Sequence, residues 1–103
     1  MQSAHTPPPA PAALDAAGRR LLWRCRRGMK ELDLLLGYYA RATLAGASAG
    51  ERAAFAELLA LPDPLLAAFL LGELEPEPAH LAQLVGRIRA LCRRGPAAAL
   101  FSQ

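Results

Sequence analysis

Apolar side chains recur at spacings of three and four along residues 19–95, which is the period of an amphipathic helix. Polar residues fill the intervening positions, and Gly or Pro interrupts the pattern at intervals. This pattern predicts five short helices with brief connections, each burying its apolar stripe against the others. We therefore expect an all-α domain, a compact five-helix bundle over residues 19–96, with flexible termini.

The first two predicted helices meet at Gly28. The first contains the run RRLLWRCRR and should end at Gly28, because glycine readily adopts the left-handed conformation that closes a helix. The second should extend from Met29 to Thr43. Glu31 and Asp33 then lie in its first turns, where the helix dipole favours negative charge. The sequence thus predicts a helix–Gly–helix corner.

The three later helices have recognisable start signals. Ser48 followed by Glu51 forms a capping box, in which each side chain satisfies a free backbone N–H. Asp63 can cap the fourth helix, with Pro64 at its first position, where a missing N–H costs nothing. Pro78 lies near the start of the fifth helix. Outside the bundle, we expect a disordered Pro/Ala-rich tail over residues 1–18 and a loose tail over residues 97–103.

Composition supports the all-α prediction. The 103-residue chain is 53% apolar, but Val and Ile occur only once each and six residues are aromatic, which argues against a sheet. No run approaches the roughly 18 apolar residues of a membrane span, so we expect no membrane insertion. No Lys or Arg occurs before residue 19, unlike a secretory or mitochondrial targeting segment. A bacterial cytoplasmic protein fits best.

Charge is unevenly distributed along the chain. The net charge is +3, yet residues 1–41 carry +4, residues 42–86 carry −5 and residues 87–103 carry +4. If the two basic ends meet in the fold, one face is basic and can attract an anionic partner. The opposing interpretation is that each helix simply exposes its charges to water.

Few residues suggest catalysis or metal binding. His5 and His80 have no neighbouring metal-ligand residues, and the chain has no Walker or GxGxxG motif. Cys25 lies among arginines that could activate a thiol, but no His lies nearby in sequence, and packing explains it better. Cys25 and Cys92 are expected to be free, buried thiols. We expect no enzyme.

Two binding hypotheses concern the arginine-rich corner. A small basic nucleic-acid-binding module would use Trp23 and the arginines, but Glu31 and Asp33 would repel phosphate. A protein-binding site fits better, because Trp and Arg are frequent at binding hot spots and Gly28 allows close approach. The residues alone leave open a purely structural alternative, in which Gly28 is a cap between dipole-matched charges.

The segment RLLWRCRRGMKELDLLLGYYA resembles the signature of the succinate dehydrogenase assembly factor, or flavinylation factor (SdhE), family. The family motif R-G-x-x-E is matched by Arg27, Gly28 and Glu31. The residues around this motif also match: Trp23, Cys25, Leu32 and Asp33. The resemblance covers about residues 19–96.

The resemblance implies a five-helix factor that is not itself an enzyme. Such a factor binds the flavoprotein subunit of succinate dehydrogenase, and often of fumarate reductase, and promotes covalent attachment of FAD to a histidine of that client. It implies no tightly bound cofactor and no nucleic-acid partner. The residues we expect to contact the client are Arg20, Trp23, Arg26, Arg27, Gly28, Met29, Glu31 and Asp33.

Overall fold

The structure, a computed structural model, describes residues 14–95, and this part of the chain is all-α with no β-strand. Its elements are α1 (Ala16–Arg24), α2 (Lys30–Thr43), the 3-10 turn η2 (Leu44–Gly46), α3 (Ala49–Leu59), α4 (Asp63–Leu70) and α5 (Ala79–Arg93). The predicted five-helix bundle is therefore confirmed. What the sequence predicts for residues 1–13 and 96–103 lies outside the described residues.

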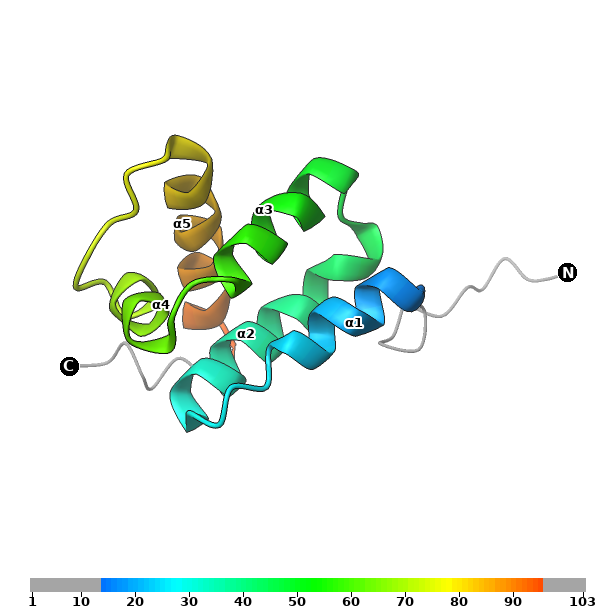
Figure 1. Cartoon of the computed structure of the whole chain (residues 1–103), viewed down its shortest axis with the longest axis horizontal. Coiled ribbons are helices and arrows are strands. Elements are labelled where there is room, and N and C mark those ends of the chain that lie inside the picture. Colours follow the sequence, from blue (N-terminus) through cyan, green and yellow to red (C-terminus); the bar gives the residue numbers. More distant parts are fainter. Residues whose placement is uncertain (1–13, 96–103) are drawn as a thin grey trace, which may run out of the picture.

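Helix α2 is the centre of the bundle (Figure 1). It packs against α1, α4 and α5, and α5 also packs against α3 and α4. Helix α1 packs chiefly along α2, and the basic end of the chain in α5 packs against α2 as well, where Arg41 and Arg87 line a common pocket. The basic residues that line the groove beside the first corner come from α1, the following loop and α2.

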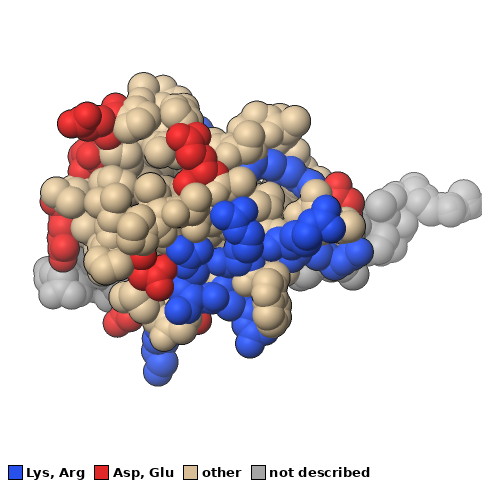
Figure 2. Space-filling view, viewed as in Figure 1, with Lys and Arg blue, Asp and Glu red and all other residues tan. Residues whose placement is uncertain are grey.

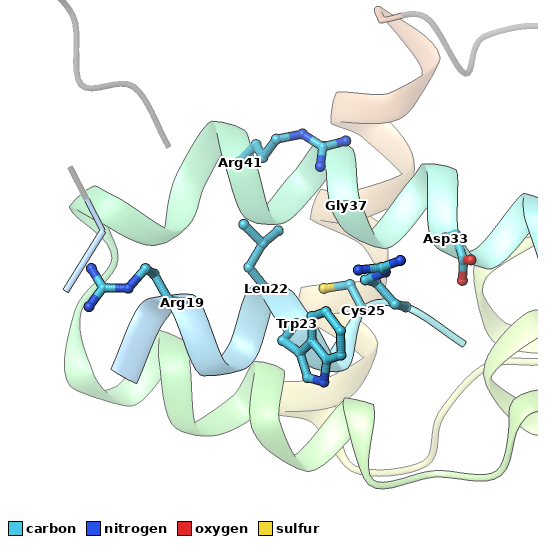
Figure 3. Close-up of a pocket in the computed structure, with 8 residues that line it drawn as sticks. Arg19, Leu22, Trp23, Cys25, Asp33, Gly37 and Arg41 are labelled. Atoms are coloured by element: carbon cyan, nitrogen blue, oxygen red, sulfur yellow. The ribbon is translucent and has the colours of Figure 1, made fainter. Parts of the chain in front are cut away.

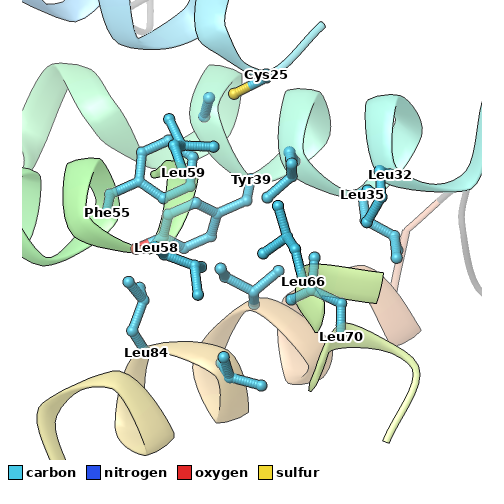
Figure 4. Close-up of a cluster of buried hydrophobic side chains, with 14 of the residues drawn as sticks. Cys25, Leu32, Leu35, Tyr39, Phe55, Leu58, Leu59, Leu66, Leu70 and Leu84 are labelled. Atoms are coloured by element: carbon cyan, nitrogen blue, oxygen red, sulfur yellow. The ribbon is translucent and has the colours of Figure 1, made fainter. Parts of the chain in front are cut away.

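Leucines from every helix build the core around α2 (Figure 4). The rings of Tyr39 and Phe55 contact each other in this core, with their centroids 5.2 Å apart and their planes tilted by 49°. Burying each large apolar side chain contributes about 1.5–3 kcal/mol, so the predicted stripe of α2 holds the fold together. Its fully buried members are Leu32, Leu35 and Leu36.

Helix α1 begins earlier and ends earlier than the sequence indicated. Leu14 is only 3% exposed, and the Asp15 carboxylate caps the helix by accepting a 2.7 Å hydrogen bond from the Gly18 N–H. Order therefore begins inside the segment that we assigned to the N-terminal tail. The helix ends at Arg24, with Cys25 as its C-cap, so the prediction that Gly28 closes it is wrong.

The later start signals were mostly correct. The Ser48–Glu51 capping box is present, and Pro78 directly precedes α5. Asp63, however, does not cap α4: Pro62 occupies the N-cap position and Asp63 is the first helical residue. The Asp63 carboxylate is engaged elsewhere, as described below. None of the helices in residues 14–95 is both long enough and apolar enough to cross a membrane.

Candidate functional site

A short loop joins α1 to α2 and contains Gly28 at a φ of +86°, a conformation that other residues adopt only with strain. The Asp33 carboxylate, from the first turn of α2, folds back onto this loop. It accepts hydrogen bonds from the backbone N–H of Arg27 at 2.6 Å and of Gly28 at 3.3 Å. Asp33 thus fixes the loop conformation just before α2, whose N-cap residue, Met29, makes no side-chain capping hydrogen bond.

The Arg27 side chain points into the fold and is only 15% exposed. Its Nε donates to the Asp63 carboxylate at 2.8 Å, which explains why Asp63 does not cap α4. Its terminal nitrogens donate to three backbone carbonyls, those of Arg24 at 3.1 Å, Leu59 at 2.8 Å and Leu61 at 3.0 Å. Arg27 therefore ties the α1–α2 loop to the α3–α4 connection. The sequence predicts that Arg27 contacts the client, whereas in the structure its guanidinium binds groups within the fold.

Other predicted site residues surround Gly28 at the surface. Trp23 is 65% exposed, and the Arg26 guanidinium lies 4.6 Å from its ring centroid, within cation–π range. Met29 is partly exposed, and Glu31 makes no hydrogen bond or ion pair within residues 14–95. A Cβ built on Gly28 would meet no atom within 4 Å, so the space above the glycine is open.

A groove between α1 and α2 adjoins this corner (Figure 3). It has a volume of about 570 Å³ and is lined by Arg19, Leu22, Trp23, Cys25, Arg26, Asp33, Gly37 and Arg41. Three predicted site residues, Trp23, Arg26 and Asp33, are therefore brought together there. Sequence reasoning missed Gly37 and Arg41, although their spacing of four from Asp33 onward places all three on one face of α2.

Lysines and arginines gather over α1 and the following loop, whereas acidic residues gather toward the α4–α5 end (Figure 2). The α4–α5 connection carries three exposed acids, Glu73, Glu75 and Glu77. Arg20 belongs to the basic side and is exposed without lining the groove. The molecule therefore presents a basic surface at the candidate site without help from the basic end of α5.

Cys25 lies beneath the groove and is 2% exposed, with its Sγ donating to the Leu21 carbonyl at 3.4 Å. Burial raises the pKa of this thiol to about 12, despite the favourable charges of nearby arginines. Burial also raises the pKa of Cys92, which is fully buried. Both cysteines are free, as predicted. Cys25 is therefore a packing residue.

We expect the Cys25 thiol to be inert toward Ellman's reagent at pH 8. With a pKa near 12, its thiolate fraction is about a thousandfold below that of an ordinary thiol. The variant Cys92→Ala isolates Cys25, and labelling should become fast only in guanidinium chloride. Rapid labelling of the folded variant would contradict the buried, protonated thiol. Because the unfolded thiol ionises near pH 9, its contribution to stability is lost as the pH rises from about 9 to about 12.

The described residues contain no group of three or more His, Cys, Asp or Glu side chains that could hold a metal ion. His80 pairs with Glu57 at 2.8 Å on the surface of the bundle. The groups at the corner are suited to binding a partner. They are cationic and aromatic side chains and the exposed backbone at Gly28.

The sequence of the chain, including this corner, is similar to proteins of one family. Residues 19–92 match the family model described as flavinator of succinate dehydrogenase. The chain is 47% identical over 72 residues to a FAD assembly factor of Methylococcus capsulatus, covering 70% of this chain and 87% of the relative. It is 46% identical over 70 residues to that of Legionella pneumophila strain Paris, covering 68% and 87%.

The FAD assembly factor of Coxiella burnetii is 37% identical over 75 residues, covering 73% of this chain and 92% of that protein. No solved structure matches the chain. The family match runs from within α1 to nearly the end of α5 and includes the whole corner around Gly28. The chain therefore belongs to the family of flavinators of succinate dehydrogenase.

Proposed function

We propose that this chain is an assembly factor that binds the flavoprotein subunit of succinate dehydrogenase and promotes covalent attachment of FAD to a histidine of that client. The observation that carries the proposal is the family match over residues 19–92, which includes the R-G-x-x-E motif in the α1–α2 corner. The exposed corner supports it, because Gly28 has no side chain of its own and a Cβ placed there would meet no atom from elsewhere in the fold within 4 Å, which leaves room for a protein partner.

In this proposal some motif residues stabilise the loop and others contact the client. Arg27 and Asp33 hold the loop rigid through their hydrogen bonds. Gly28, Met29 and Glu31 then face the client from a preformed surface. A preformed loop loses little conformational freedom on binding, so more of the contact energy remains as affinity. Arg20, Trp23 and Arg26 extend the contact along α1.

We propose that bond formation takes place on the client and that the factor acts by positioning. Holding two reacting groups in the correct geometry can be worth about 7–11 kcal/mol in favourable cases. The buried thiols support this assignment, because neither Cys25 nor Cys92 offers an accessible nucleophile. The proposal includes no tightly held FAD on the factor, extends to the flavoprotein of fumarate reductase as a second client, and places the factor in the bacterial cytoplasm.

The test is a deletion strain complemented with variants of this chain. We expect little covalent flavin on the succinate dehydrogenase flavoprotein without the factor, seen as weak in-gel flavin fluorescence, and full recovery with the wild-type chain. Normal flavinylation in the deletion strain would exclude the proposed function.

Glu31→Ala should lower client affinity by about tenfold or more, as expected for a binding hot spot, and reduce flavinylation accordingly. The fold should be unchanged within about 0.5 kcal/mol, because Glu31 is exposed and has no partner within residues 14–95. Client affinity is measured by calorimetry and folding by helical circular dichroism. The matched control is Glu73→Ala, which removes the same charge from the α4–α5 connection. Equal effects of the two variants would exclude a specific contact by Glu31.

The nucleic-acid hypothesis receives no support from the comparisons, since the relatives reported above are all assembly factors. It makes a distinct prediction, a DNA or RNA mobility shift that weakens steeply with salt. The exposed Glu31 carboxylate beside the basic corner disfavours phosphate binding there.

A further inference from the structure

The groove between α1 and α2 has the dimensions and lining of a binding site for a short segment of polypeptide. Its volume of about 570 Å³ lies within the range of about 300–1,000 Å³ common for ligand pockets. Leu22 and Trp23 supply an apolar wall from α1, and Arg41 lies across from them on α2 (Figure 3). The groove is therefore amphipathic, with an apolar side and a cationic rim.

The charges of the groove do not balance among its own residues. Three arginines line it, Arg19, Arg26 and Arg41, against the single acid Asp33. The Asp33 carboxylate is already engaged, because it accepts the N–H groups of the α1–α2 loop. Arg41 makes no hydrogen bond or ion pair with any described residue. The groove therefore carries a net positive charge that an anionic occupant would neutralise.

Gly37 allows Arg41 to lie in this position. A Cβ at residue 37 would lie 3.1 Å from one terminal nitrogen of Arg41 and 3.4 Å from the other, and these are its nearest neighbours. Glycine in the middle of a helix lowers helix stability, so its use here needs a local reason. Its absent side chain gives the Arg41 guanidinium room to lie over α2 at the edge of the groove.

We propose that this groove binds an acidic segment of the protein partner, with its carboxylates at Arg19 and Arg41 and an apolar side chain against Leu22 and Trp23. The identity of that partner as the flavoprotein subunit rests on the proposed function. This contact lies on the α1–α2 face and is additional to the approach at Gly28. Arg19 retains donors for it, because its hydrogen bond to the Leu14 carbonyl uses one terminal nitrogen.

An acidic peptide fits the groove better than a nucleic acid does. The Arg26 guanidinium already covers a face of the Trp23 ring, which limits stacking by a base. The apolar wall of Leu22 and Trp23 has no counterpart in a phosphate backbone, whereas a peptide can place an aliphatic side chain there. Opposite charges on the two partners would also accelerate their encounter at low salt.

Two variants test the proposal with the full chain and the purified flavoprotein subunit. Arg41→Glu reverses the charge at the rim, and Gly37→Leu fills the groove and displaces Arg41. Each should weaken client binding by about tenfold, and Arg41→Glu should also flatten its dependence on salt. Arg41→Lys should retain part of the affinity. Flavinylation should recover when the factor is supplied in excess, because the groove contributes affinity rather than the positioning contact at Gly28.

Each variant has a matched control outside the groove. Arg94→Glu makes the same charge change at the exposed end of α5. Gly86→Leu makes the same steric change on an exposed part of α5 where a Cβ meets nothing within 4 Å. Both controls should bind the client within about twofold of the wild type. If the controls weaken binding as much as the groove variants do, the proposal is overturned.

A second probe tests the groove independently of the client. A fluorescein-labelled peptide of Glu and Leu should bind the wild-type chain at low salt, and a peptide with Gln in place of Glu should not. Arg41→Glu and Gly37→Leu should abolish this binding. A single-stranded oligonucleotide that binds instead, with the same sensitivity to Arg41→Glu, would overturn the proposal. If the client itself does not bind the wild-type chain, the proposed function fails, and the peptide result still decides the role of the groove.

Discussion

Arg27→Ala should lower the free energy of unfolding by about 2–3 kcal/mol, even though Arg27 belongs to a motif expected to contact the client. The guanidinium donates to one carboxylate and three carbonyls and is mostly buried, and hydrogen bonds to charged groups contribute about 1.5–3 kcal/mol. Alanine would leave Asp63 without its cation. For a domain of this size, the loss corresponds to a melting temperature about 10–20 °C lower.

Urea unfolding followed by circular dichroism measures this effect, with Arg20→Ala as the control. Arg20 is exposed, so its removal should change stability by no more than about 0.5 kcal/mol. Arg27→Lys should recover little, because a single ammonium group cannot reach all the acceptors that the planar guanidinium joins. A stable Arg27→Ala variant with weakened client binding would instead show that Arg27 touches the client directly.

Gly72→Ala should lower the free energy of unfolding by about 2–3 kcal/mol, more than the same substitution at Gly28 does. Both glycines have a φ near +87°, at +88° and +86°, so alanine at either site is strained by about 1–2 kcal/mol. Their surroundings differ. A Cβ at residue 72 would lie 2.7 Å from a terminal nitrogen of Arg89, whose side chain is packed against the α4–α5 connection, whereas a Cβ at residue 28 meets nothing.

Thermal unfolding of the two alanine variants tests this difference. We expect Gly28→Ala to lower the free energy of unfolding by about 1–2 kcal/mol, which is the backbone strain alone. Its client affinity should also fall, because the added methyl group narrows the approach to the loop. Equal destabilisation would mean that Arg89 moves aside without cost. Unchanged client binding by a folded Gly28→Ala variant would show that no partner approaches this glycine closely.

We expect the residues of the R-G-x-x-E motif to have two different roles, one in stabilising the fold and one in contacting the client. Sequence reasoning treated Arg27, Gly28 and Glu31 as one binding surface. In the structure Arg27 lies inside the fold, whereas Glu31 faces solvent beside an open glycine. Loss of function in an Arg27 variant is therefore uninformative until its stability has been measured, whereas loss in a stable Glu31 variant identifies a contact.

The sequence determined the helices, because their signals are local. Apolar spacing located the buried stripe of α2, and the Ser48–Glu51 pair located the start of α3. The motif and its flanking residues were enough to indicate the family. Asp15 and Gly18 also carried a local cap signal for α1, but the Pro/Ala-rich segment before them obscured it.

Tertiary structure alone decided where the long side chains of the corner point. Three of the four side-chain partners of Arg27 lie 32 to 36 residues away in α3, α4 and their connection, so nothing near Arg27 in sequence indicates that it joins these elements. The groove has the same origin, because Arg19 and Arg41 come to line one groove only when α1 packs along α2. Helices form from contacts within a few residues, whereas the direction of an arginine depends on carboxylates and carbonyls that folding brings to it from elsewhere in the chain.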